Sequence, residues 1–307
     1  MNTPHQESTA LPAQIGIGFL FAIASAALFA IRPILVKLVY AESVDPTTLI
    51  LLRMAISMPI YLILLIYFLR TKPHRREALS PARVAIISVL GLFGYFIASF
   101  FDLIGLQYVS AQLGRLILYT YPTFTVVLGA LFFMQKITAR TVAAMLITYL
   151  GVAIIFGHDL KAMGQDVVTG SLWIIASAMS FAIYLLWSKS HIDKVGSQLF
   201  TCVALISASL GIFVYWGLTA APTADLDVST KAWIYISLIA IFCTVVPTFF
   251  TTAAVERIGP ERTGIVAMIG PGFTSAFAVL MLSEAFTIYH LAGLMITIIG
   301  ISFLPKK

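Results

Sequence analysis

Long apolar runs separated by short polar segments occupy most of the chain from residue 14 to residue 304. A helix needs about 20 apolar residues to cross a hydrocarbon core of about 30 Å. Ten runs come close to or exceed this length and predict ten transmembrane helices: 14–36, 47–69, 83–104, 111–134, 139–157, 169–189, 197–218, 231–254, 261–282 and 286–304. The longest gaps between them are about a dozen residues, so we expect no folded soluble domain.

Composition agrees with this pattern, because 60% of the 307 residues are hydrophobic and only 10% are charged. Soluble domains carry about 25% charged residues, which excludes an ordinary soluble enzyme, a disordered chain and a nucleic-acid-binding protein. The first apolar run is longer than a signal-peptide core, and we expect it to be retained as a helix. Cys202 and Cys243 lie in apolar runs without CxxC spacing, which favours two buried free thiols.

Basic residues predict the orientation in the membrane, because Lys and Arg accumulate in cytoplasmic loops. When the segment between the second and third runs is placed inside, 13 of the 19 Lys and Arg residues lie on the cytoplasmic side. Three lie outside (Lys37, Lys161, Lys231) and three within spans (Arg32, Arg53, Arg115). Both termini are then cytoplasmic. The net charge of +6 becomes a topology signal that requires no nucleic-acid partner.

The chain also repeats itself. Residues 18–37 and 170–189 share ten of twenty positions at an offset of 152, and residues 122–151 share nine of thirty with 271–300 at an offset of 149. Each half, 14–157 and 169–304, thus holds five spans, and an odd number sends the second half into the membrane from the opposite side. Such inverted repeats form the central cavity of many secondary transporters. A duplicated scaffold without a transport role is the alternative.

This pattern resembles the EamA-like branch of the drug/metabolite transporter superfamily. The resemblance covers nearly the whole chain and includes the stretches 104–110, 116–123 and 136–138, together with Arg53. The second half departs from the family pattern, because Gly270-Pro271-Gly272 replaces the usual Tyr-Pro. The resemblance implies a bacterial inner-membrane carrier that moves small metabolites, often outward, with the fifth and tenth spans peripheral.

Charged residues inside spans are the first candidates for a site, because a charge in the membrane is costly. Arg32, Arg53, Arg115 and Asp102 are expected at one level in the outer part of the first four spans. Guanidinium groups match carboxylate or phosphate groups, so Arg32 and Arg115 are candidate anchors for an anionic substrate. The alternatives are snorkelling to the interface or an ion pair with Asp102. For Arg53 we favour the structural interpretation.

Polar and aromatic residues at helical spacing extend the candidate site. Arg115, Tyr119 and Pro122 share one helix face, as do Tyr95, Ser99 and Asp102. Tyr184 belongs to a stripe in the sixth span, and Thr248 to one in the eighth. These side chains are expected to line the substrate path, although helix packing explains Ser and Thr as well.

Prolines suggest a mechanical role for the fourth and ninth spans. Pro122 and Pro271 occupy equivalent repeat positions, and Gly270 and Gly272 loosen the backbone beside Pro271. Broken helices often mark a transporter cavity, which predicts gating kinks here. Static kinks that only shape packing are the alternative.

Ionisable groups that could couple transport to protons are scarce. Asp102 is the only carboxylate expected well inside a span, and all five histidines are placed in loops, tails or span ends. Either Asp102 carries the proton that couples transport, or the protein is an exchanger or facilitator. We favour the second, in which Asp102 is the ion-pair partner of an arginine.

No enzyme motif, metal set or nucleotide-binding loop is found, so we expect no enzyme, no cofactor and no metal. The sequence therefore predicts a carrier of small polar metabolites, such as amino acids or organic anions, that works by alternating access. A lipid-like substrate flippase, or a channel or sensor of the same fold, is the alternative. The expected partners are a small-molecule substrate, the lipid bilayer and possible homodimer contacts, without nucleic acid.

Overall fold

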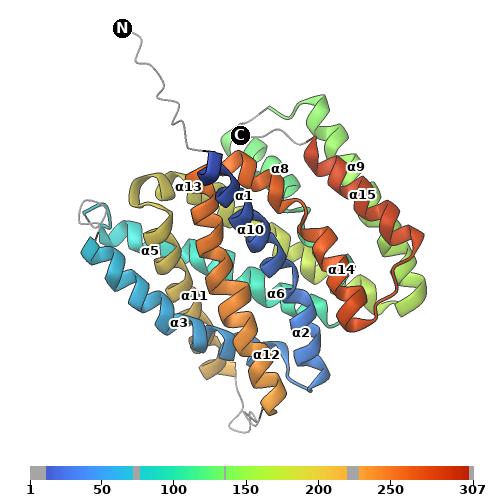
Figure 1. Ribbon diagram of the computed structural model, residues 1–307, viewed down its shortest axis with the longest axis horizontal. Coiled ribbons are helices and arrows are strands. Elements are labelled where there is room, and N and C mark those ends of the chain that lie inside the picture. Colours follow the sequence, from blue (N-terminus) through green and yellow to red (C-terminus); the bar gives the residue numbers. More distant parts are fainter. Residues whose placement is uncertain (1–11, 72–76, 135, 220–227, 304–307) are drawn as a thin grey trace.

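The computed structural model describes residues 12–71, 77–134, 136–219 and 228–303, and within these ranges all regular structure is helical. Figure 1 shows helices crossing the molecule in alternating directions, with α1 beginning and α15 ending at the same end. The elements are α1 (Pro12–Ala30), α2 (Arg32–Ala41), α3 (Pro46–Thr71), α5 (Pro81–Gly91), η1 (Leu92–Ile97), α6 (Ala98–Leu106), α7 (Ala111–Leu118), α8 (Tyr121–Phe133), α9 (Ala139–Met163), α10 (Asp166–Val195), α11 (Ser197–Thr219), α12 (Thr230–Ala240), η2 (Ile241–Val245), α13 (Val246–Ala267), α14 (Gly270–Leu282) and α15 (Ile288–Ser302).

Nine helices or runs of joined helices in the described ranges are long and apolar enough to span a membrane. The tenth predicted run forms α15, a shorter apolar helix of 15 residues. It begins after Thr287 rather than at residue 286, because the Thr287 side chain caps its first turn. The helical fold class is confirmed, whereas the count of ten spans stays a prediction.

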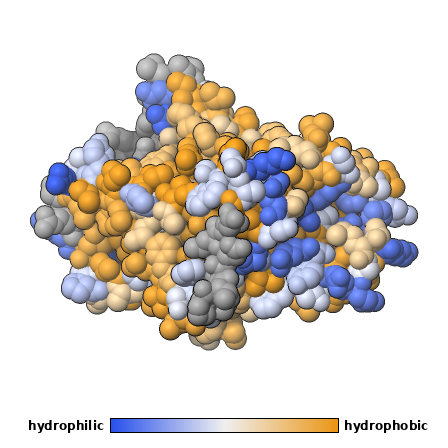
Figure 2. Space-filling view, turned by 90° about the horizontal axis from the view of Figure 1, so that it is seen from below, coloured by the Kyte–Doolittle hydropathy of each residue, from blue (hydrophilic) through white to orange (hydrophobic). Residues whose placement is uncertain are grey.

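Apolar side chains cover much of the outer surface as well as the core. Large residues such as Leu131, Leu146, Leu172, Leu218 and Leu280 are more than half exposed. Figure 2, which views the end of the molecule away from the start of α1, shows broad hydrophobic areas beside a hydrophilic region. Such an extensive apolar surface is expected where lipid takes the place of water as solvent.

Helix pairs from the two halves of the chain pack side by side. α1 packs along α13, α3 along α11, α6 along α10, and α9 along α15 at one edge of the molecule (Figure 1). The close approach of α9 and α15 depends on glycine, because a Cβ atom at Gly151 would lie 2.6 Å from the carbonyl oxygen of Gly293. Small residues at such crossings let backbones approach closely in membranes. The peripheral position of this pair agrees with what the family resemblance implies.

Some boundaries differ from those predicted. The first span breaks at Ile31, because Pro33 in the first turn of α2 lacks the N–H that would continue the helix. The eighth span was predicted to end at residue 254, but α13 continues past it, since Ile258 is buried against Gly18 of α1. Cys202 and Cys243 are buried free thiols, as predicted.

Candidate functional site

A cavity of about 960 Å³ lies between the helices of the two halves. Its lining comes from α1, α2, α3, η1, α6, α7, α8, α10, α11, η2, α13 and α15. Its volume falls at the upper end of the range of small-molecule sites, about 300–1,000 Å³. The cavity is therefore large enough for a metabolite.

The charged side chains that line this cavity, within the described residues, are Arg32, Arg53, Asp102 and Arg115. Three guanidinium groups face one carboxylate, which leaves a formal surplus of two positive charges. The four residues come from α2, α3, α6 and α7, so the formal charge that the described residues give the cavity comes from the first half of the chain. The structure thus brings together the four residues that the sequence placed at one level.

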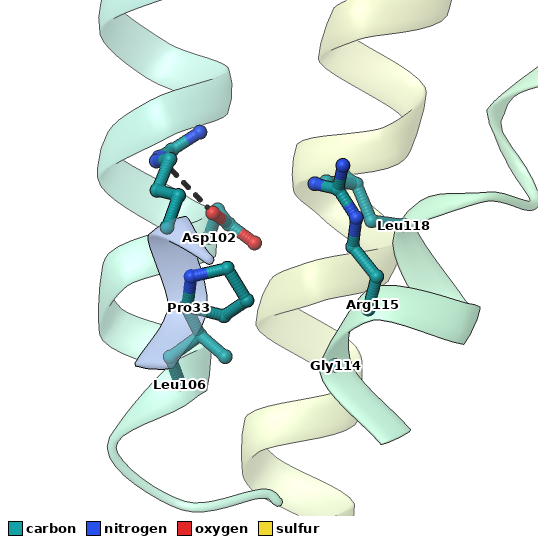
Figure 3. Close-up of a pocket in the computed structure, with 7 residues that line it drawn as sticks. Pro33, Asp102, Leu106, Gly114, Arg115 and Leu118 are labelled. Atoms are coloured by element: carbon teal, nitrogen blue, oxygen red, sulfur yellow. Dashed lines mark ion pairs between the residues drawn. The ribbon is translucent and has the colours of Figure 1, made fainter. Parts of the chain in front are cut away.

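Arg32 and Asp102 form an ion pair, with 3.1 Å between Arg32 Nη2 and Asp102 Oδ2. Both residues also line a small side pocket with Arg115, Pro33 and Leu118. Figure 3 shows Asp102 with its dashed ion pair on one side, Pro33 below it, and the Arg115 side chain on a separate helix on the other side. Asp102 thus neutralises Arg32 rather than Arg115.

Arg53 and Arg115 are less well compensated. Arg53 is 2% exposed, and its Nε atom, like those of Arg32 and Arg115, is buried without a hydrogen-bond partner among the described residues, but Arg32 alone of the three has a carboxylate partner there. The Arg115 guanidinium lies over the Tyr119 ring at 5.1 Å. Burying a charged donor without an acceptor is unfavourable unless a ligand supplies one.

The fourth span is interrupted where the sequence predicts a kink. α7 ends at Leu118 and α8 begins at Tyr121, with Pro122 in its first turn. The interruption is a tight turn, in which the Thr120 N–H donates to the carbonyl oxygen of Ile117 at 2.9 Å. Pro122 and Tyr119 both line the cavity, so the break shapes its wall.

The ninth span is interrupted in the same way between α13 and α14. Here the Ile269 N–H donates to the carbonyl oxygen of Val266 at 3.0 Å. Gly270 packs against the Tyr119 side chain and Pro271 is buried, whereas a Cβ atom at Gly272 would meet open space. These three residues are not among those that line the cavity, and only Gly270 meets a steric need for glycine.

The polar candidates separate into two groups. Tyr95, Ser99 and Thr248 line the cavity as predicted. Tyr184 does not: it is 5% exposed and lies behind Tyr95, with 3.0 Å between the two hydroxyl oxygens. Its ring packs against Gly94 and Phe200, so α10 presents Ser177 and Phe181 to the cavity instead.

Two features of the cavity wall were not predicted. The third span contains the π-helical segment η1, and the eighth contains η2. η1 contributes Gly94 and Tyr95 to the cavity lining, and η2 contributes Cys243 and Thr244. Such segments release backbone carbonyls from the helical ladder and occur frequently at functional sites. The carbonyl oxygen of Phe93 accepts from the Ala98 N–H, five residues on, and also from the Ser180 hydroxyl at 2.7 Å. Apolar periodicity alone carries no signal for one inserted residue.

A second polar cluster lies away from the cavity, where α9 ends and α15 begins. His158, Asp159 and His290 place one nitrogen or oxygen atom each within 4.8 Å of one another. From the sequence, all five histidines are expected in loops, tails or span ends, and no metal site is expected. The helix pairing that joins them is not visible from spacing along the chain.

Comparison with known proteins agrees with this architecture. A model described as the EamA-like transporter family matches residues 16–157 and again 168–304. An uncharacterized transporter of Bacillus subtilis, YcbK, is 25% identical over 282 residues, which cover 90% of this chain and 88% of that protein. An uncharacterized transporter of Clostridium kluyveri is 19% identical over 92% of this chain and 91% of its own length.

A crystal structure of another protein superposes with a TM-score of 0.63 over 93% of this chain and 95% of that chain. Its sequence is 16% identical, so it supports the fold alone. The matches to the family model cover both halves, and the relatives are transporters rather than enzymes. This chain therefore belongs to the EamA-like transporter family.

Proposed function

We propose that the protein is a secondary carrier that exports small polar metabolites with an anionic group, such as amino acids or organic anions, across the inner membrane of a bacterium. The observation that carries this proposal is the charge of the central cavity. Three arginines and one aspartate line a volume of about 960 Å³, and the aspartate is engaged by Arg32. Arg53 and Arg115 remain to receive an anion.

The chemistry of guanidinium favours a carboxylate or phosphate as that anion. Its planar fork of donors binds two oxygens of one such group, and these charge-assisted bonds are among the strongest in proteins. In a cavity of low dielectric, an anion would relieve the cost of the buried positive charges. Arg115 and Tyr119 are the best-placed anchors, because both line the cavity beside the α7–α8 break. Arg53 contributes positive potential from its buried position.

Alternating access by two inverted five-helix repeats is the mechanism that we propose. Matched local features at an offset of 149 residues support the repeat: η1 and η2 begin at Leu92 and Ile241, and α8 and α14 begin at Tyr121 and Gly270. The helices α8 and α14 also end in left-handed residues at matching positions, Met134 and Ser283. The family model's separate match to each half supports the same division. In this proposal the breaks before α8 and α14 are the hinges of the gate.

Orientation and coupling follow from charge. The excess of Lys and Arg in alternate loops supports cytoplasmic termini. The Arg32–Asp102 ion pair supports an exchanger or facilitator, because the one carboxylate that lines the cavity among the described residues is already the partner of an arginine. Substrate exchange or a downhill gradient would then drive transport.

Transport by purified protein in liposomes tests this function. Counterflow of radiolabelled amino acids and organic anions is expected to saturate with external concentration, and Arg115→Gln is expected to abolish it. Non-saturating flux would indicate a channel instead. Transfer of a fluorescent lipid between leaflets, without counterflow of any soluble anion, would indicate a flippase and contradict the proposal.

A further inference from the structure

The cluster of His158, Asp159 and His290 joins two helices that are distant in sequence. His158 and Asp159 lie near the end of α9, and His290 lies in the first turn of α15. Asp159 and His290 are 3% exposed, and neither lines the central cavity. The proposed transport function leaves this buried group without a role.

The distances in the cluster suit a metal ion. Asp159 Oδ1 lies 3.2 Å from His158 Nδ1 and 3.3 Å from His290 Nε2. In a tetrahedral zinc site, metal–ligand distances of about 2.0–2.2 Å place neighbouring ligand atoms about 3.3–3.6 Å apart. Two of the three edges are therefore close to this value already. The third edge, between the two histidine nitrogens, is at most 4.8 Å, and the partly exposed His158 ring would have to turn to shorten it.

Hydroxyl groups hold the outer atoms of two of these side chains. The Ser110 hydroxyl donates to Asp159 Oδ2 at 2.6 Å, and Thr287 Oγ1 lies 2.9 Å from His290 Nδ1. Metal-binding histidines and carboxylates commonly have such second partners, which fix the orientation of the ligand. Both contacts involve the outer atoms, so the inward-facing Asp159 Oδ1 and His290 Nε2 contact each other, and a cation would replace the proton that they share.

Capping the helix does not explain why residue 290 is a histidine. At the matching position of the first half, offset by 149 residues, Thr141 closes the same turn with Thr138, with 2.9 Å between their hydroxyl oxygens. Threonine is thus sufficient for the cap. Histidine adds a second ring nitrogen, Nε2, which points at Asp159. The two halves therefore differ at this position, as expected if His290 serves as a metal ligand.

We propose that His158, Asp159 and His290 bind a divalent transition-metal ion of the zinc class. Two imidazole nitrogens and one carboxylate oxygen form a ligand set that such ions accept, with the fourth position left for water. The His158 side chain is 23% exposed and provides a route for the ion. Bound there, the ion links α9 to α15 and, through Ser110 at the start of α7, to the helix that carries Arg115.

Metal titration of the purified protein without a histidine tag tests the site. Zn²⁺ is expected to bind at one ion per chain and to raise the Tm of protein stripped with EDTA. Co²⁺ is expected to give the intense visible absorption of a four-coordinate ion. Absence of both signals would overturn the proposal, because a hydrogen-bonded cluster alone binds no metal.

Variants locate the ion. His158→Gln is the first choice, because its side chain is partly exposed and its Tm in EDTA is expected to equal that of wild type. It should weaken Zn²⁺ binding by at least about 10-fold, and His290→Gln should do the same. His191→Gln on α10 is the matched control and should bind Zn²⁺ like wild type. Equal binding by His158→Gln and wild type would place the ion elsewhere and contradict the proposal.

Discussion

The Tyr119 hydroxyl donates a hydrogen bond of 3.0 Å to the carbonyl oxygen of Ala267. In a continuous helix, that carbonyl would accept from the N–H of residue 271, but Pro271 has none. The proline in one half of the chain thus leaves an acceptor for a tyrosine in the other half. Because Arg115 lies over the Tyr119 ring, this contact connects the cavity's positive charge to the break in the ninth span.

Weakening this contact, or restoring a continuous helix at either break, should change the rate of gating. Tyr119→Phe loses a hydrogen bond of about 1 kcal/mol, which corresponds to about a fivefold shift between conformations. Pro271→Ala restores an N–H that competes for the Ala267 carbonyl, and Pro122→Ala should straighten the equivalent break in the fourth span. Counterflow rates, and the labelling by thiol reagents of cysteines introduced into the cavity wall, measure the effect of each variant. Unchanged transport and accessibility in all three variants would rule out a gating role for the breaks.

Asp102→Asn should destabilise the protein and strengthen anion binding. The change leaves Arg32 without its ion-pair partner, which we expect to cost about 1–3 kcal/mol. It also raises the net charge of the cavity by one unit. Thermal unfolding in detergent measures stability, and ligand titration measures affinity. The double variant Arg32→Gln/Asp102→Asn should be more stable than the two single effects predict. Additive losses would show that the pair is not coupled.

The α9–α15 crossing should be sensitive to a single methyl group. Gly151→Ala places a Cβ atom 2.6 Å from the Gly293 carbonyl oxygen and should cost about 1–3 kcal/mol. Gly157→Ala on the same helix meets nothing within 4 Å and serves as the control. It should be neutral or stabilising by up to about 1 kcal/mol, because alanine favours helix. Equal Tm values for the two variants would contradict the close packing of these helices.

Single-cysteine labelling tests the orientation. Lys161→Cys is expected on the outer face and Lys189→Cys on the cytoplasmic face. Cys202 and Cys243 are first replaced by alanine, because Cys243 lines the cavity and could react with the reagent. A thiol reagent that cannot cross the membrane should label whole cells of the first variant and only opened cells of the second. The reverse pattern would invert the topology.

Much of the fold follows from local properties of the sequence. Apolar runs of membrane length predict the long helices, and Pro122 predicts the break before α8, because proline removes a backbone donor wherever it stands. The position of each residue along its apolar run also predicts that four charged residues lie at one depth in the membrane: Arg32, Arg53, Arg115 and Asp102. All four line one cavity.

Other features depend on which helices pack together, and the order of the helices along the chain does not reveal this. Tyr184 shares a helical stripe with cavity residues, yet the rotation of α10 places it behind Tyr95. The π-helical segments need one inserted residue, which apolar periodicity does not register. His158 and His290 become neighbours only because α9 packs along α15.

Ligand-induced thermal stabilisation of wild type and arginine variants tests the central claim most directly. An anionic metabolite at 100 times its Kd should stabilise wild type by about 2.7 kcal/mol. Arg115→Gln should lose this shift, and Arg32→Gln should lose less of it, because Asp102 already neutralises that arginine. Lys189→Gln removes an exposed charge outside the cavity and should retain the full shift. If only cationic or neutral compounds stabilise the protein, and the cavity variants respond like wild type, the arginines are structural and the proposed substrate class is wrong.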